Sequence, residues 1–147
     1  MADNIHEGAL DGSGLTLAIV VSRFNEEVTS RLLASCLKTF HSKGWKDSRL
    51  KVVHVPGGYE IAWAAAELAR TGRYSAVVAL GCVLKGQTPQ NDHISSSLVS
   101  SLHRVSLETR VPVILGVITP NTWKQALART RGALDRCREA ALAALEM

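Results

Sequence analysis

Four stretches of the chain are almost continuously apolar, and each is short enough to be a single β-strand. They are LTLAIVVS (15–22), KVVHV (51–55), SAVVALGCVL (75–84) and VPVILGVIT (111–119). Apolar runs that do not alternate with polar residues are typical of strands covered on both faces. The pattern therefore predicts a buried parallel sheet.

The segments between these strands show the three- and four-residue spacing of amphipathic helices. Helices are predicted at 28–40, 59–72, 94–105, 121–130 and 135–147. Thr88 and Pro89 have the residue types of an N-cap and a first helical position, and Gly44 and Gly72 those of helix ends. Alternating strands and helices predict the α/β class, as a flavodoxin-like three-layer sandwich with helices on both faces of a four-stranded parallel sheet.

Residues 15–147 are expected to form one domain, preceded by a flexible arm at 1–14. The arm lacks the basic and apolar regions of a secretory signal, and no apolar stretch approaches the length of a membrane span. Cys36, Cys82 and Cys137 have no metal-like spacing. We therefore expect reduced thiols in a cytosol, no metal site and no membrane partner.

Composition adds one question, because the 147 residues carry a formal charge of +4. A nucleic-acid-binding module is one hypothesis. The basic residues are dispersed, however, and no aromatic–basic platform accompanies them. The densest group, Arg129, Arg131, Arg136 and Arg138, is typical of a solvated helix face or, alternatively, of a site for small anions.

Ligands of this fold class gather outside the carboxyl ends of the strands. Phe24 and Tyr59 follow the first two predicted strands and could stack on a flat ring, although spacing alone favours a role in filling gaps between helix and sheet. Residues 86–88 offer backbone N–H groups and a hydroxyl at a helix start, which suits an anion. Nucleotide-binding glycine motifs and a serine elbow are absent from the sequence. The residues alone thus indicate a small anionic ligand at the sheet edge.

Several motifs in one order resemble the lumazine synthase family over residues 15–147. They are VVSRFNEEVTSRLLASCL, VPGGYEI, GCVLKGQT, VSLETRVPVILGVIT and EAALAALEM. The resemblance implies a cytoplasmic transferase of riboflavin biosynthesis that needs no cofactor. It would condense 5-amino-6-(D-ribitylamino)uracil with 3,4-dihydroxy-2-butanone 4-phosphate, releasing phosphate and water to give 6,7-dimethyl-8-ribityllumazine.

The resemblance also implies which residues bind the pyrimidine and its ribityl chain. Phe24 would stack on the ring, and Glu60 would accept hydrogen bonds from hydroxyl groups. The remaining contacts would come from Gly58 and Tyr59 and from backbone groups of Cys82, Val83 and Leu84.

For the second substrate, the resemblance implies that Gln87 and Thr88 bind the phosphate at the helix start and that Arg129 completes this site. Arginine suits the role because its fork can pair two phosphate oxygens. Leu115 stands where the family usually has a phenylalanine near the site of the neighbouring subunit. Arg136 takes the place of a lysine.

The catalytic residues depart from the family pattern, because Gln90 occupies the position of the family's histidine. Glutamine forms hydrogen bonds but does not exchange a proton near neutral pH. His93, on the same helix, or a bound water could carry the proton; a histidine in an exposed first turn usually just faces water. Alternatively, positioning alone drives the reaction, or catalysis has been lost.

The family's active sites lie between adjacent subunits of a pentamer, and some members pack twelve pentamers into an icosahedral capsid. Arg129 and Leu115 would then reach a neighbour's site. The resemblance thus implies a homo-oligomer, a pentamer, decamer or 60-mer, with riboflavin synthase as a candidate partner. The alternative is a silent paralogue that binds a flavin-like ligand or forms a shell. At 131–138, helix-forming residues replace glycines that are usual in the family. This replacement predicts a more continuous helix in this segment than in the family.

Overall fold

A four-stranded parallel sheet forms the centre of the computed structural model, which describes residues 7–10 and 14–147. Its strands are β1 (Leu17–Ser22), β2 (Leu50–Val55), β3 (Ala76–Cys82) and β4 (Val113–Ile118), in the order β2-β1-β3-β4. β1 and β3 occupy the centre and every residue in them is buried, which explains their unbroken apolar sequences. The predicted strands and parallel sheet are confirmed.

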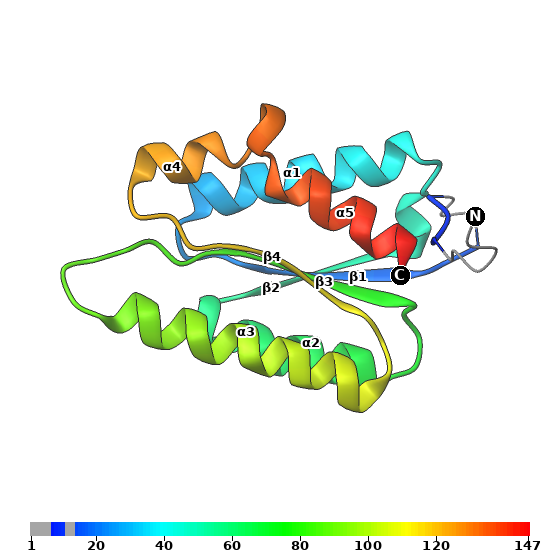
Figure 1. Ribbon diagram of the computed structural model, residues 1–147. Helices are drawn as coiled ribbons and strands as arrows, with labels where there is room; N and C mark the ends of the chain where they lie inside the picture. The colour runs from blue at the N-terminus through cyan, green and yellow to red at the C-terminus, as the bar shows by residue number, and fades with distance from the viewer. Residues whose placement is uncertain (1–6, 11–13) are drawn as a thin grey trace, which may run out of the picture.

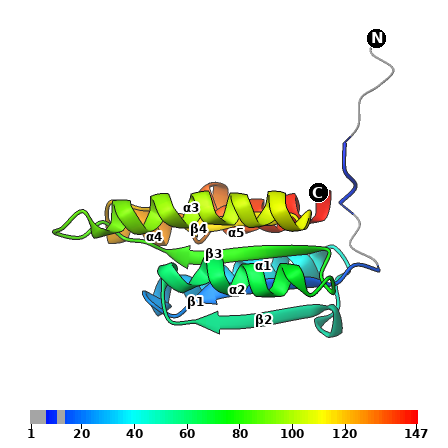
Figure 2. The same ribbon diagram turned by 90° about the horizontal axis from the view of Figure 1, so that it is seen from below.

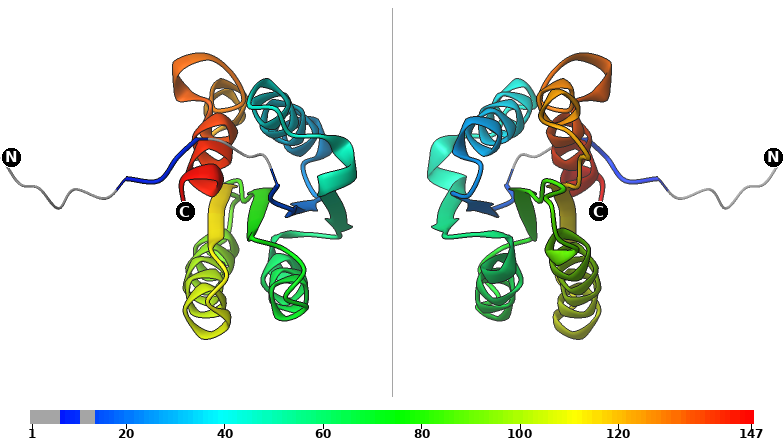
Figure 3. Two further views of the ribbon diagram at one scale, coloured as in Figure 1. Left: turned by 90° about the vertical axis from the view of Figure 1, so that its right-hand side faces the viewer. Right: turned by 90° about the vertical axis from the view of Figure 1, so that its left-hand side faces the viewer.

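Helices cover both faces of the sheet, so the predicted three-layer sandwich is also confirmed. One layer holds α1 (Glu26–Ser42), α4 (Trp123–Ala128) and α5 (Arg136–Glu146), and the other holds α2 (Gly58–Arg70) and α3 (Gln90–Thr109) (Figures 1 and 3). α2 and α3 pack side by side (Figure 2). Two single-turn 3₁₀ helices, η1 (Asp47–Arg49) and η2 (Gly132–Leu134), lie in the connections.

Each face of the sheet buries its own hydrophobic core. The core under α1 and α5 includes Phe40, whose ring centroid lies 5.6 Å from that of Trp45. The core under α2 and α3 includes Ile61, whose Cδ1 would lie 2.9 Å from a Cβ at Gly81. A side chain at this strand position would therefore force the Ile61 side chain to shift, which agrees with the glycine near the end of β3.

The structure corrects the sequence analysis at two helix starts. Thr88 does not cap α3: the helix begins at Gln90, the carbonyl of Pro89 accepts the N–H groups of Asp92 and His93, and no side chain caps the helix. The segment 131–138 is not a continuous helix, because Gly132 has a φ of 63° and Asp135 caps a new helix.

The predicted arm at 1–14 lies largely outside the described residues. Within the described residues, no helix is both long enough and apolar enough to cross a membrane.

The three cysteines are free and buried, and this makes stability sensitive to alkaline pH. Burial raises the pKa of Cys36 to about 12 and that of Cys82 to about 11, and it raises the pKa of Cys137 as well. In the unfolded chain a thiol ionises near pH 8.5. Above that pH the unfolded state loses protons that the folded state keeps, so stability is lost as pH rises.

We therefore expect the free energy of unfolding to fall by about 1 kcal/mol per thiol between pH 9 and 10. Denaturant titrations at pH 8, 9 and 10 would measure the slope. Cys36→Ala should reduce that slope by the contribution of one thiol, whatever its own effect on stability at pH 8. An unchanged slope in this variant would show that other groups cause the alkaline loss.

Candidate functional site

A cleft of about 410 Å³ opens at the carboxyl edge of the sheet, between the starts of α2 and α3. The loop from β3 to α3 contributes to its lining and projects beyond the end of the sheet (Figure 1). Because α1 and α3 leave the adjacent strands β1 and β3 on opposite faces, this edge is where the sheet can open to a ligand. The lining residues are Phe24, Gly57, Gly58, Tyr59, Glu60, Cys82, Val83, Leu84, Gly86, Thr88, Gln90, Asn91 and Ile94.

The turn after β1 holds Phe24 in the cleft by hydrogen bonds to two neighbouring loops. The N–H of Phe24 donates to the carbonyl of Pro56 at 3.0 Å. Asn25, with a φ of 60°, donates through Nδ2 to the carbonyl of Cys82 at 3.0 Å. The Phe24 side chain is 70% exposed and Tyr59 is 75% exposed. The rings therefore do not fill gaps between helix and sheet, contrary to what spacing alone favours.

The start of α2 brings its backbone close to the other wall of the cleft. A Cβ at Gly58 would lie 3.2 Å from Cγ2 of Val83 and 3.5 Å from Cγ2 of Ile94, so only glycine leaves ordinary spacing here. The carboxylate of Glu60 lies beside the same turn, with Oε2 3.3 Å from the position of a Cβ at Gly57. Glu60 is the only charged side chain among the described residues that line the cleft.

The α3 wall presents polar groups that have few internal partners. The hydroxyl of Thr88 makes no hydrogen bond to another described residue, and Gln90 and Asn91 place two side-chain amides beside it. Gln87 lies between Gly86 and Thr88 but is not part of the lining. His93 is exposed and does not line the cleft either.

Some lining residues were missed by the sequence analysis. Ile94 could have been found from helix spacing, because it lies four positions after Gln90 on the same face of the helix. Asn91, one position after Gln90, carries no such signal. Gly57 lines the cleft as well, although only its neighbour Gly58 was predicted as a site residue. Asn25 does not line the cleft but orients Phe24, and two features mark it in the structure: its positive φ and its Nδ2 hydrogen bond to the carbonyl of Cys82.

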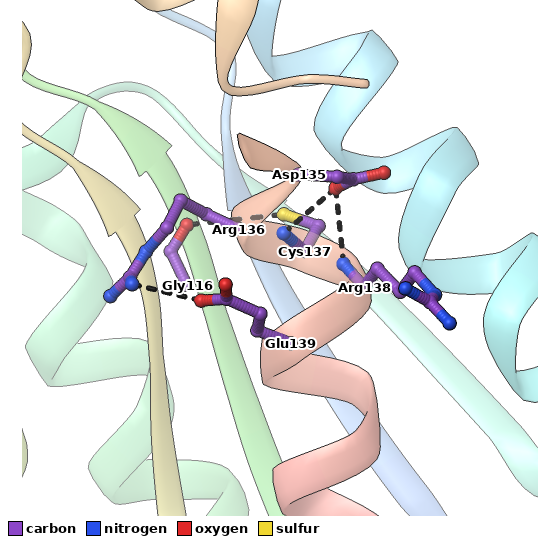
Figure 4. A network of polar contacts seen from close by, with 6 residues as sticks. All are labelled: Gly116, Asp135, Arg136, Cys137, Arg138 and Glu139. Atoms are coloured by element: carbon purple, nitrogen blue, oxygen red, sulfur yellow. Dashed lines mark hydrogen bonds and ion pairs between the residues drawn. The ribbon is translucent and has the colours of Figure 1, made fainter. Parts of the chain in front are cut away.

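Besides Gln87 and His93, three more expected site residues lie outside the cleft of their own chain. Arg129 belongs to the opposite helical layer, at the end of α4, where Nη1 donates to the carbonyl of Gln125 at 3.1 Å. Leu115, on the edge strand β4, is 39% exposed. Arg136 pairs with Glu139 at 2.9 Å (Figure 4). One copy of the chain therefore gathers only part of the expected site.

The position of Arg136 follows from how α5 begins. Asp135 Oδ1 accepts the N–H groups of Cys137 and Arg138, at 3.0 and 3.1 Å, and its other oxygen accepts the hydroxyl of Ser35 on α1. Arg136 extends from the side of the helix opposite to Arg138 (Figure 4). The cap thus ties α5 to α1 while Arg136 remains accessible.

The described residues contain no group of three or more histidine, cysteine, aspartate or glutamate side chains that could hold a metal ion. The described cleft lining offers two aromatic rings, backbone polar groups, two hydroxyl groups, two amides and one carboxylate.

Comparison with known proteins gives a consistent picture. Residues 14–147 match the family model described as 6,7-dimethyl-8-ribityllumazine synthase. A curated protein of Salinibacter ruber (strain DSM 13855 / M31), named 6,7-dimethyl-8-ribityllumazine synthase, is 46% identical over 142 residues. This alignment covers 96% of the present chain and 91% of the relative.

Proposed function

Because the chain belongs to the 6,7-dimethyl-8-ribityllumazine synthase family, we propose that the cleft between α2 and α3 is its active site. The chain is a transferase of riboflavin biosynthesis. In the cleft, 5-amino-6-(D-ribitylamino)uracil and 3,4-dihydroxy-2-butanone 4-phosphate condense to 6,7-dimethyl-8-ribityllumazine. The observation that carries this assignment is the arrangement of an exposed aromatic ring, a glycine turn and an unpaired hydroxyl around one cleft.

The pyrimidine occupies the side of the cleft next to the first two loops. Phe24 stacks on its ring, which agrees with an aromatic side chain held in the cleft rather than in the core. Gly58, Tyr59 and Glu60 hold the ribityl chain. Backbone groups of Cys82, Val83 and Leu84 hold the polar edge of the ring, so these side chains matter less than their position.

The phosphate of the butanone binds at the start of α3, next to Gln87 and Thr88. The free N–H groups of a helix start and the Thr88 hydroxyl favour an anion there. The only charged lining side chain is nevertheless a carboxylate, so a doubly charged phosphate needs a cation from elsewhere. We assign this cation to Arg129 of a neighbouring copy, with Arg136 and Leu115 at the same junction.

Assembly into pentamers would supply these residues. Apolar side chains that remain exposed on one copy support such contacts: Trp63 on α2 is 72% exposed, and Leu107 and Leu115 are exposed on α3 and β4. Tyr59 and Trp63 also line a groove between α2 and α3. A pentamer, a decamer and an icosahedral capsid differ in mass by large factors, so sedimentation distinguishes them.

We place the enzyme in the cytoplasm, where riboflavin synthase would use its product.

The experiment that tests the activity mixes purified protein with both substrates and follows the absorbance and fluorescence of the lumazine. We expect a clear acceleration over the reaction without protein. No acceleration by folded, oligomeric protein would overturn the assignment and favour a silent paralogue. Binding of a flavin-like ligand would then be measured by fluorescence quenching of the tryptophans.

A further inference from the structure

The condensation requires protons to move inside the cleft. When the 5-amino nitrogen attacks the ketone carbon and water is later lost, the nitrogen gives up two protons and the ketone oxygen gains two. A side chain that accepts each proton from nitrogen and returns it to oxygen ends in its starting state. Such a proton carrier normally contributes about 10²–10⁴-fold to the rate.

Most side chains of the cleft cannot carry these protons. Gln90 and Asn91 are amides, which form hydrogen bonds without exchanging protons near neutral pH. His93 lies outside the cleft lining. The side chain of Cys82 belongs to the core under α1 and α5, and burial raises the pKa of this thiol to about 11.

Glu60 is placed differently from all of these. It is the only carboxylate of the lining, and it lies on the α2 side of the cleft, where the pyrimidine binds in the proposed function. Its N–H donates to the carbonyl of Gly57, and its carboxylate lies beside the same turn, so the first turn of α2 brings it to the cleft. The side chain makes no hydrogen bond to another described side chain and remains open to a ligand.

From this arrangement we propose that Glu60 carries the protons of the condensation, in addition to binding the ribityl chain. As the lone pair of the 5-amino nitrogen forms the bond to the ketone carbon, the nitrogen becomes positive and the oxygen negative. Glu60 accepts a proton from that nitrogen and delivers it to the oxygen. A second transfer lets the oxygen leave as water while the carbon–nitrogen double bond forms. A carboxylate suffices because the nitrogen is strongly acidic once it is positively charged.

This inference rests on the proposed function, and one substitution separates the two. Glutamine at this position keeps the hydrogen bonds to hydroxyl groups but cannot carry protons. We expect Glu60→Gln to lower kcat about 100-fold while KM for the pyrimidine changes less than about threefold. Glu67→Gln, an exposed position on the same helix, is the matched control and should keep wild-type kinetics.

A second variant tests the chemistry without the side chain. In Glu60→Ala, added formate should restore part of the lost kcat, because a small carboxylate can occupy the vacated space. A raised KM with unchanged kcat in Glu60→Gln would overturn the inference and leave Glu60 as a binding residue only. A low kcat in Glu60→Ala that added formate does not restore would also overturn the inference. If the wild-type protein itself gives no acceleration, the proposed function fails instead.

Discussion

Replacing Arg129 by alanine is expected to raise KM for the butanone phosphate about 100-fold while changing KM for the pyrimidine by less than about threefold. The described lining of the cleft contains no cation, so removal of this guanidinium would leave a phosphate at the proposed site with backbone N–H groups and one hydroxyl. A 100-fold loss corresponds to about 2.7 kcal/mol, which is typical of a charged partner that pairs two oxygens. Initial rates at varied concentrations of each substrate would give the two constants.

Two further variants make this measurement specific. Arg129→Lys should recover only part of the affinity, because an ammonium group cannot pair two phosphate oxygens as a guanidinium does. Arg131→Ala removes an equal charge only two residues after Arg129, and the Arg131 side chain is exposed. If Arg131→Ala had the same effect, the net positive charge of the region would explain the binding. Equal increases in both KM values for Arg129→Ala would refute its assignment to the phosphate.

At a butanone phosphate concentration far below the raised KM of Arg129→Ala, mixing two variants of low activity is expected to raise the activity. Arg129→Ala keeps an intact cleft, and Thr88→Asp keeps an intact Arg129 but places a negative charge where the phosphate binds. In a ring assembled at random from equal amounts, about one quarter of the junctions combine the intact cleft with the intact arginine. Co-refolded mixtures should therefore reach up to about a quarter of wild-type activity.

This result depends on Arg129 acting between copies. If the arginine served the cleft of its own chain, every chain in the mixture would carry one defect, and mixing would restore nothing. The same two variants assembled separately and then combined provide the control, because they form mixed junctions only if the oligomers exchange subunits. Sedimentation before and after co-refolding shows that the oligomers formed.

The central strands could be predicted from sequence because burial on both faces leaves a direct pattern. β1 and β3 contain no position that faces water, so no polar residue interrupts the apolar run except at the ends. The carboxyl-edge location of the site also follows from the alternation of strands and helices alone. The family motifs added candidate roles, which remain proposals for the individual residues.

What sequence could not show depends on contacts between distant segments. Phe24 enters the cleft because its turn forms hydrogen bonds to the loop after β2 and to the end of β3, where Cys82 lies 57 residues from Asn25. The start of α3 at Gln90, later than the Thr88 cap predicted, sets which residues of the first turn face the cleft. Asn91 lines it and His93 does not, a distinction that residue types alone cannot make.

The separation of Arg129 from the cleft of its own chain has a consequence for how the enzyme responds to dilution. If Arg129 serves a neighbouring copy as proposed, a subunit released from the assembly is expected to keep its fold and its pyrimidine contacts but to bind the phosphorylated substrate weakly. Specific activity should therefore decline once the protein concentration falls below the dissociation constant of the ring, and saturating pyrimidine would not prevent it. Quaternary equilibrium, through simple mass action, thus becomes a condition for turnover.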